Sequence, residues 1–255
     1  MGESPLSRRD TVNRFFVEGA FEVGQRAGLT GADAYKLTSV LRAAPGDRVE
    51  ILDGHSRRFT GIVREVGRDR VEVELTAALE EGQREASLAI TLAQGIPKGQ
   101  KMDFVVEKAV ELGVRRIVPL VSERTVARPE GRDGKVERWR RLAKSAALQC
   151  GRGYVPEVTA PLDLDAVLTL GAAHDAVLMP WELAEPRPLR ERLDEIGAGR
   201  RLLVIVGPEG GLSQREAEQA RVAGAHLISL GPRILRTETA ALVLMAALYA
   251  LRGEL

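Results

Sequence analysis

The chain has 255 residues, a formal net charge of +1 and a hydrophobic fraction of 44%, which is the composition of a soluble globular protein with one large or two small domains. It contains no run of about 18 consecutive apolar residues, and its first residues lack the apolar core of a signal peptide, so we expect neither a membrane span nor a secretory leader. Cys150 is the only cysteine and the three histidines are scattered, which excludes an internal disulfide framework, fits a reducing cytoplasm and predicts no metal site.

Residues 1–80 have the pattern of a small antiparallel β-barrel. Short apolar or alternating runs at 15–17, 49–52, 59–66 and 71–75 are separated by turn residues, and residues 35–42 predict a brief helix. Arg14, Arg42 and Arg57 are among the basic residues of this part of the chain. They indicate either a module that binds RNA or ordinary surface charge, since acidic residues are equally common here.

The polar segment 79–85 marks a boundary between domains at 1–80 and 81–255, and strands alternate with helices beyond it. Strands are predicted at 88–93, 117–121, 176–179, 202–206 and 226–230, and helices at 102–112, 136–149, 189–196 and 240–251. We expect Trp139, Leu142, Ala146 and either Leu148 or Gln149 to face inward from the second of these helices. This alternation predicts an α/β domain with a parallel sheet covered on both faces.

Positive charge is concentrated between residues 115 and 152. The basic residues there are Arg115, Arg116, Arg124, Arg128, Arg132, Lys135, Arg138, Arg140, Arg141, Lys144 and Arg152. Such an excess is typical of a contact with a phosphate backbone, and a solvated helix face is the alternative.

Two strand-like runs, 202–206 and 226–230, each lead into a Gly-Pro pair, at 207–208 and 231–232. In α/β sheets the carboxyl ends of the strands are where ligands bind. The first loop, Gly-Pro-Glu-Gly-Gly, lacks the Gly-Lys-Ser/Thr ending of a P-loop, and the chain has neither a Rossmann G-x-G-x-x-G fingerprint at the start of this domain nor a G-x-S-x-G nucleophile elbow. It opens a helix through the capping-box sequence 213–216.

The second loop carries Arg236, Thr237, Glu238 and Thr239 directly before the final helix, 240–251, which is apolar on every face. A helix that is hydrophobic all round must be buried, and this one is too short to cross a bilayer. We therefore expect it to pack partly against another subunit, with burial inside its own domain as the alternative.

These motifs closely resemble those of the ribosomal RNA small subunit methyltransferase E family, within the SPOUT superfamily. The resemblance rests on V-G-P-E-G-G-L-S-x-x-E at 206–216 and L-G-x-R-I-L-R-T-E-T-A at 230–240. V-L-R-x-x-x-G-D at 40–47, the Lys101–Gly113 motif K-x₆-K-A-V-E-L-G and Q-C-G-R at 149–152 extend it over nearly the whole chain. Many relatives have a histidine where Tyr35 stands and a glutamate where Leu148 stands.

The resemblance implies a PUA-like barrel followed by an α/β methyltransferase domain with a deep trefoil knot, in a homodimer. It also implies transfer of a methyl group from S-adenosylmethionine to N3 of a uridine in 16S rRNA of the small ribosomal subunit. By analogy the cofactor lies among three loops, whose implied cofactor-binding residues are Leu178, Met179, Pro180, Val206, Gly207, Glu209, Gly210, Gly211, Leu230, Gly231, Ile234, Leu235 and Thr239.

N3 of uridine loses a proton as the methyl group arrives, so negative charge develops on the base. We expect Arg236 to stabilise that charge, Glu238 to accept the proton and Thr237 or Thr239 to orient them, although Glu238 could instead only favour the helix dipole. Arg14, Arg42, Arg57 and Arg152 are the expected RNA contacts. A ribose 2′-O-methyltransferase of the same superfamily and a non-catalytic RNA-binding ribosome-assembly factor are the alternatives.

Overall fold

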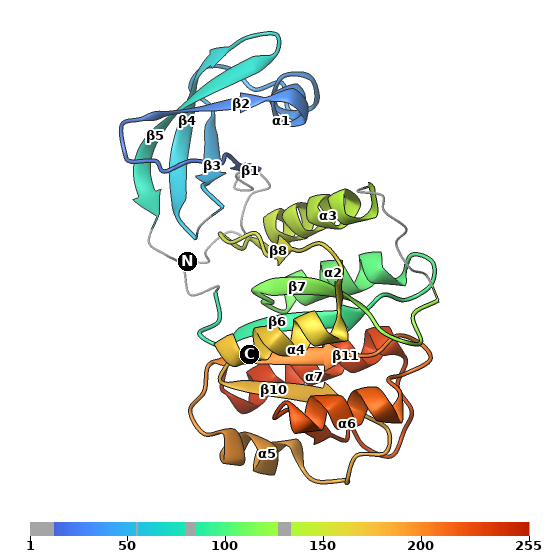
Figure 1. Cartoon of the computed structure of the whole chain (residues 1–255). Coiled ribbons are helices and arrows are strands. Elements are labelled where there is room, and N and C mark those ends of the chain that lie inside the picture. Colours follow the sequence, from blue (N-terminus) through green and yellow to red (C-terminus); the bar gives the residue numbers. More distant parts are fainter. Residues whose placement is uncertain (1–12, 55, 80–84, 127–133, 255) are drawn as a thin grey trace, which may run out of the picture. The chain divides into compact units, whose positions relative to one another are not determined.

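The computed structural model describes residues 13–54, 56–79, 85–126 and 134–254, and these form two compact units (Figure 1). The first unit comprises Met1–Glu85 with Gly151–Val155, and the second comprises Ala86–Cys150 with Pro156–Leu255. The expected boundary at residue 80, the first twelve residues, on which the expectation about a leader rests, and the basic residues Arg128 and Arg132 lie outside the described residues.

The first unit is a curled sheet with a short helical segment. Its elements are β1 (Asn13–Phe16), β2 (Arg26–Thr30), α1 (Gly31–Tyr35), the π-helix η1 (Lys36–Val40), β3 (Arg48–Leu52), β4 (Arg58–Val66) and β5 (Arg70–Leu79). The strands lie in the order β1-β3-β4-β5-β2, and β1 pairs with β3 in parallel. The expectation of an antiparallel barrel is therefore wrong for this pair, whereas the β3–β4, β4–β5 and β2–β5 pairs are antiparallel as expected.

Alternation along the strands gives this unit its core. Val71, Val73 and Leu75 are fully buried, whereas Glu72 and Glu74 between them lie on the outer side of β5. Strand β2 has no counterpart among the predicted elements, since its sequence Arg-Ala-Gly-Leu-Thr carries few of the residues that favour strands. The predicted helix at 35–42 begins earlier, at Gly31, and ends at Val40.

The second unit alternates strands and helices as predicted. Its elements are β6 (Ala89–Gly95), α2 (Lys101–Glu111), β7 (Arg116–Val121), α3 (Gly134–Cys150), β8 (Glu157–Val158), β9 (Leu162–Asp163), α4 (Leu164–Leu170), the 3-10 helix η2 (Gly171–Ala173), β10 (Ala176–Pro180), α5 (Leu189–Ile196), β11 (Arg201–Val206), α6 (Gln214–Val222), β12 (His226–Ile228) and α7 (Thr237–Leu251). The strand order is β12-β10-β11-β6-β7-β8, with β9 also beside β7, and every pair is parallel. The parallel sheet is thus confirmed.

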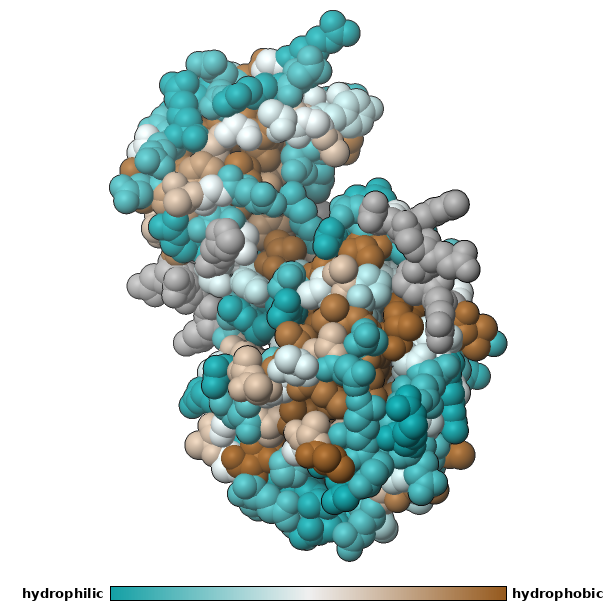
Figure 2. Space-filling model, in the orientation of Figure 1, coloured by the Kyte–Doolittle hydropathy of each residue, from teal (hydrophilic) through white to brown (hydrophobic). Residues whose placement is uncertain are grey.

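Helices cover both faces of this sheet (Figure 1). Helices α2 and α7 pack together against β6 and β11, and α4 and α6 cover the opposite face. Leu203 and Ile205 point to the α4 and α6 side, and Leu202 and Val204, which alternate with them, are equally buried on the other side. In Figure 2 hydrophilic residues cover much of the outer surface of this unit around a hydrophobic central area. Within the described residues, no helix has both the length and the apolarity needed to cross a bilayer.

Helix α3 presents a different face from the one predicted. Trp139 and Ala146 are buried as expected, but Ala143 takes the inward place expected for Leu142, which is half-exposed, and Gln149 is exposed. The small side chains let α3 approach α2 closely, where Asp103 accepts a hydrogen bond from Trp139 Nε1 at 3.1 Å.

Asp175 fastens the start of β11, and its ionisation makes the stability of the second unit depend on pH. The carboxylate accepts the backbone N–H groups of Arg200 and Arg201, each at 2.8 Å, and a side-chain bond from Arg201 at 2.9 Å. The side-chain bond from Arg201, followed by the two backbone bonds, lowers the pKa of Asp175 to about 2. Because the folded state favours the ionised form, its contribution is complete above the unfolded pKa of about 4 and is lost as the pH falls towards 2.

We expect Asp175→Asn to lower the free energy of unfolding at neutral pH, with the deficit shrinking to nothing as the pH approaches 2. Urea denaturation at a series of pH values measures this. Asp194→Asn, an exposed carboxylate on α5, is the matched control and should track the parent protein throughout. A deficit that stays constant with pH would contradict the assigned role of the charge.

Candidate active site

Three loops meet at the carboxyl edge of the parallel sheet. In register, Pro180 at the end of β10 pairs with Ile228 of β12, and Val206 at the end of β11 pairs with Gln94 of β6. The loops that follow these strands therefore emerge on one edge, which is where α/β sheets bind ligands. The predicted cofactor residues differ in burial. Leu178, Met179 and Val206 are buried in the sheet. The exposed ones are Glu209, Gly210, Gly231, Ile234 and Thr239.

The loop after β11 lies against the end of β6, and glycines make this contact possible. A Cβ at Gly95 would come within 2.4 Å of the Pro208 nitrogen, and a Cβ at Gly207 would come within 2.9 Å of the Gly211 carbonyl carbon. Both contacts are to backbone, which cannot move aside. The loop is held further by Arg124, whose Nη1 donates to the Gly210 carbonyl at 2.7 Å.

Thr237 connects this loop to the final helix. Its hydroxyl donates to the Gly207 carbonyl at 2.5 Å and accepts from Nε2 of Gln94 at 2.8 Å. Thr237 is only 6% exposed and Gln94 is fully buried. Thr237, which we expected to orient the catalytic groups, therefore joins the backbone of the loop to the start of α7. Gln94 was missed, although an amide at the end of an apolar strand is a signal that sequence inspection could have used.

Two carboxylates and one lysine gather beside this junction. Nζ of Lys101, at the start of α2, lies 3.1 Å from Oε1 of Glu209 and 3.8 Å from Oε2 of Glu238. Oε1 of Glu209 also accepts the backbone N–H of Lys98 at 3.0 Å. The Glu209 side chain thus fastens its loop to α2, a role beyond the predicted contact with a cofactor, and Lys101 was missed.

Arg236 lies at the N-cap of α7 and is exposed. Its side chain makes no hydrogen bond or ion pair with any part of the chain that the structure describes, so its guanidinium is available to a ligand. Glu238 lies two residues further on, in the first turn of the helix, and its side chain is 14% exposed. The three predicted catalytic residues are consecutive in the chain, and the structure places them at one helix terminus, with Arg236 exposed and Glu238 largely buried.

The capping box predicted at the start of α6 is confirmed, and it also makes a contact outside the helix. Ser213 accepts from the backbone N–H of Glu216, and the Glu216 carboxylate accepts from the backbone N–H of Ser213. Glu216 is 2% exposed and also accepts the backbone N–H of Glu123 at 2.8 Å. It thereby joins the loop after β7 to the loop after β11.

The four arginines expected to contact RNA all belong to the first unit, and they differ in accessibility. Arg42 is exposed and has a positive φ of 53°, Arg14 pairs with Glu50, and Arg57 pairs with the buried Asp53. Their side chains are therefore accessible to different extents.

Arg152 is 3% exposed and pairs with Glu85 at 2.7 Å, within the same unit. This burial argues against a direct RNA contact by Arg152 and assigns it to the anchoring of residues 151–155. Sequence inspection could detect the charge of Arg152 but not its ion pair.

Within the described part of the basic stretch 115–152, several side chains are already neutralised. Arg138 pairs with Asp103, Arg140 with Glu137 and Arg116 with Glu157. The predicted excess of positive charge is therefore smaller in the fold than in the sequence.

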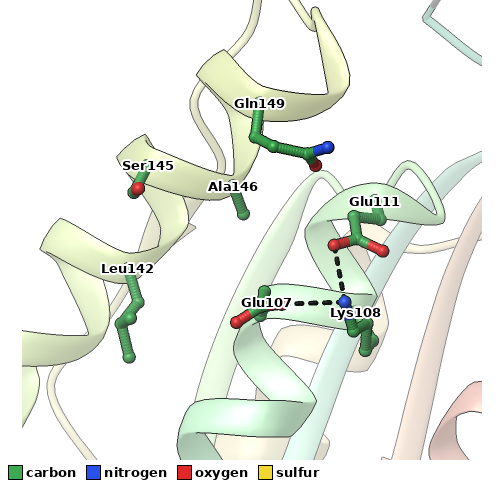
Figure 3. Close-up of a pocket in the computed structure, with 7 residues that line it drawn as sticks. All are labelled: Glu107, Lys108, Glu111, Leu142, Ser145, Ala146 and Gln149. Carbon is green, nitrogen blue, oxygen red and sulfur yellow. Dashed lines mark hydrogen bonds and ion pairs between the residues drawn. The ribbon is translucent and has the colours of Figure 1, made fainter.

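A groove of about 380 Å³ lies away from these loops, between α2 and α3 (Figure 3). Its polar residues from α2 are Glu107, Lys108 and Glu111, and the two carboxylates pair with the lysine at 2.7 and 2.8 Å. The hydrogen bonds from Glu107 and then Glu111 raise the pKa of Lys108 to about 12. Both carboxylates of the groove are already hydrogen-bonded to the lysine, whereas Oε2 of Glu238 at the sheet edge has no hydrogen-bond partner within the described residues, so the groove offers less chemistry. No group of three or more His, Cys, Asp or Glu side chains among the described residues could hold a metal ion.

Models of known domains match both units. An RNA methyltransferase domain matches residues 84–249, and an RNA methyltransferase PUA domain matches residues 37–76. The chain is 33% identical to a methyltransferase structure from Legionella pneumophila in complex with S-adenosylmethionine, with a TM-score of 0.84 over 94% of this chain and 97% of that one. The parallel sheet, the loops at its edge and these matches define the class as an RNA methyltransferase domain with a PUA domain.

Two further relatives narrow the class. The ribosomal RNA small subunit methyltransferase E of Neisseria gonorrhoeae bound to S-adenosyl methionine is 33% identical, with a TM-score of 0.82 over 94% of this chain and 98% of that one. The protein of the same description from Synechocystis is 32% identical over 88% of this chain and 72% of its own length. The chain belongs to the ribosomal RNA small subunit methyltransferase E family, as its sequence motifs predict.

Proposed function

We propose that this chain transfers a methyl group from S-adenosylmethionine to N3 of a uridine in 16S rRNA. The observation that carries the proposal is the hydrogen bond from Thr237 to the glycine-rich loop at the sheet edge, which fixes the helix start that carries Arg236 and Glu238, in a chain of this family. Relatives of 33% identity over nearly the whole chain are described as bound to S-adenosylmethionine, and the loops expected to bind it are complete here.

The loops at this edge fit the proposed cofactor. Gly231 has a φ of 98°, and a Cβ added there would meet nothing within 4 Å, so backbone groups lie open to a ligand. The loop around Gly207 is fixed by Thr237 and Arg124 before any ligand arrives. Backbone groups of residues 207–211 and 230–235 would hold the cofactor, which supplies an electrophilic methyl group when bound.

The residues of the chain provide what the uracil base needs. Arg236 would stabilise the negative charge that develops on the base as N3 loses its proton, and an oxygen of Glu238 would accept that proton. Thr237 would hold the start of α7 so that both side chains keep their positions. A carboxylate that accepts a proton suits transfer at the acidic N–H of a base better than transfer to a ribose hydroxyl, which is far less acidic.

We further propose a homodimer that acts in the cytoplasm, with the first unit binding rRNA through Arg14, Arg42 and Arg57. The deep trefoil knot is also proposed. The course of the chain supports it, because α7 follows the edge strand β12 and packs back against α2 and the inner strands β6 and β11.

Reverse transcription of 16S rRNA from a strain that lacks the protein tests the function. N3 methylation blocks Watson–Crick pairing and stops the polymerase, so we expect one stop to disappear and to return when the gene is restored. Digestion of the RNA to nucleosides identifies the product. A 2′-O-methylated nucleoside would support the ribose methyltransferase instead, and unchanged rRNA with no binding of S-adenosylmethionine in calorimetry would support the non-catalytic RNA-binding factor.

A further inference from the structure

Lys101 is the side chain that joins α2 to both carboxylates of the candidate site. It contacts Glu209 of the glycine-rich loop at 3.1 Å and Glu238 of α7 at 3.8 Å, which are more than 100 positions away along the chain. The Lys101 side chain is 38% exposed, whereas that of Glu238 is 14% exposed. A single cation therefore serves two anions in a partly enclosed place.

The carboxylates of Glu209 and Glu238 differ in the number of their hydrogen-bond partners. Glu209 has the closer contact with Lys101 and also accepts the Lys98 N–H. Burial acts to raise the pKa of Glu209, but hydrogen bonds from its own backbone, Lys101 and Lys98 outweigh it and lower the pKa. Oε2 of Glu238 is buried and has no hydrogen-bond partner within the described residues.

With one lysine and two ionised glutamates, the cluster has one negative charge in excess, and the better-bonded Glu209 is the carboxylate that Lys101 neutralises. The excess charge therefore falls on Glu238. When Glu238 accepts a proton, the cluster becomes neutral and the pair Lys101–Glu209 remains matched.

We propose that Lys101 is a positioning residue that keeps Glu238 ionised as proton acceptor and couples it to the glycine-rich loop. The inference deepens the proposed function and rests on it. Without the lysine, the two carboxylates would lose the cation that both contact, and like charges in one cluster without a cation oppose the ionisation of both groups.

The variant Lys101→Met tests the inference through the pH dependence of methyl transfer to 16S rRNA. We expect the acid limb of the rate–pH profile to move up by about one pH unit or more, so that the rate below the limb falls by about tenfold or more. Lys101→Arg should restore the profile, because it returns the cation. A merely structural role for Lys101 predicts a loss that is equal at every pH, and that result would overturn the proposal.

Lys108→Met is the matched control, since Lys108 also lies on α2 and also pairs with two glutamates, but at the α2–α3 groove (Figure 3). Its profile should superimpose on that of the parent protein. A shift of the same size in both variants would show a general effect of removing charge from α2 and would also overturn the proposal.

A second measurement keeps this inference separate from the proposed function. Carbon-13 NMR of labelled glutamate carboxyls, with the Glu238 signal assigned by its loss in Glu238→Gln, reports titration without any turnover. We expect the pKa of the Glu209–Glu238 pair to rise in Lys101→Met. A rise in a protein that methylates no rRNA would leave the charge coupling intact and refute only the function, whereas an unchanged titration would refute the role of Lys101.

Discussion

Replacing Arg236 with alanine is expected to lower kcat for methyl transfer by about 10²- to 10³-fold, the loss typical of removing one preorganised group that stabilises a developing anion. Arg236 is exposed at the N-cap of α7 and pairs with no other side chain among the described residues, so its removal leaves no buried partner behind. The fold and the loops that would hold the cofactor should remain. Single-turnover transfer to 16S rRNA and calorimetric binding of S-adenosylmethionine, expected to stay within a few-fold, measure the two effects separately.

The control for Arg236→Ala is Arg190→Ala, because Arg190 is an exposed arginine on α5, away from the sheet edge that carries the loops. It should retain full activity. Arg236→Lys keeps the positive charge but loses the planar set of donors, so an intermediate rate is expected. Turnover of Arg236→Ala close to that of the parent would falsify a role for Arg236 in the reaction.

Much of the second unit could be predicted from sequence because its strands are buried on both faces. Such strands read as short apolar runs, and those at 88–93, 117–121 and 202–206 appear in the structure within two residues of the predicted ends. Helix α5 was predicted at its observed bounds and α6 was identified by its capping box. Local patterns of this kind depend only on neighbours along the chain.

The contacts that build the candidate site could not be predicted in the same way. Gln94 meets Thr237, and Lys101 meets Glu209, across more than 100 residues, and no periodicity records which side chains the sheet order brings together. The loops were found because glycines and prolines mark them, whereas the lysine beside them belongs to an ordinary helix start. Burial of Arg152 was missed for the same reason, since its partner Glu85 lies 67 residues away.

The composition of the final helix predicts that α7 is buried, but it does not show which part of the helix its own chain covers. Its sequence is apolar all round, but the chain buries only part of it, and an exposed stripe remains that contains Thr239, Val243 and Ala250. Val243 is 43% exposed, and Phe104 on the adjacent α2 is 48% exposed. Ile234, in the loop before the helix, is 95% exposed. Helices α2 and α7 pack together, and exposed large apolar side chains on such helices are typical of a subunit interface, which supports the proposed homodimer.

We therefore expect Val243→Glu to convert the proposed dimer to a monomer. A carboxylate placed twice in a symmetric apolar interface, without a partner, costs several kcal/mol, which raises the dimer dissociation constant by about a hundredfold or more. Sedimentation velocity over a range of concentrations measures the change. Methyl transfer should fall as the dimer is lost, because α7 begins at the residues that carry the proposed chemistry and loses its cover on that side.

Val222→Glu provides the comparison that isolates the interface. Val222 is 75% exposed at the end of α6, on the opposite face of the sheet, so a glutamate there adds the same charge to the chain without touching α7. Its sedimentation and activity should match those of the parent protein. If Val243→Glu also sediments as the parent does, the stripe on α7 is not the interface, and the apolar surface around Val243 must be covered by something other than a second copy of this chain.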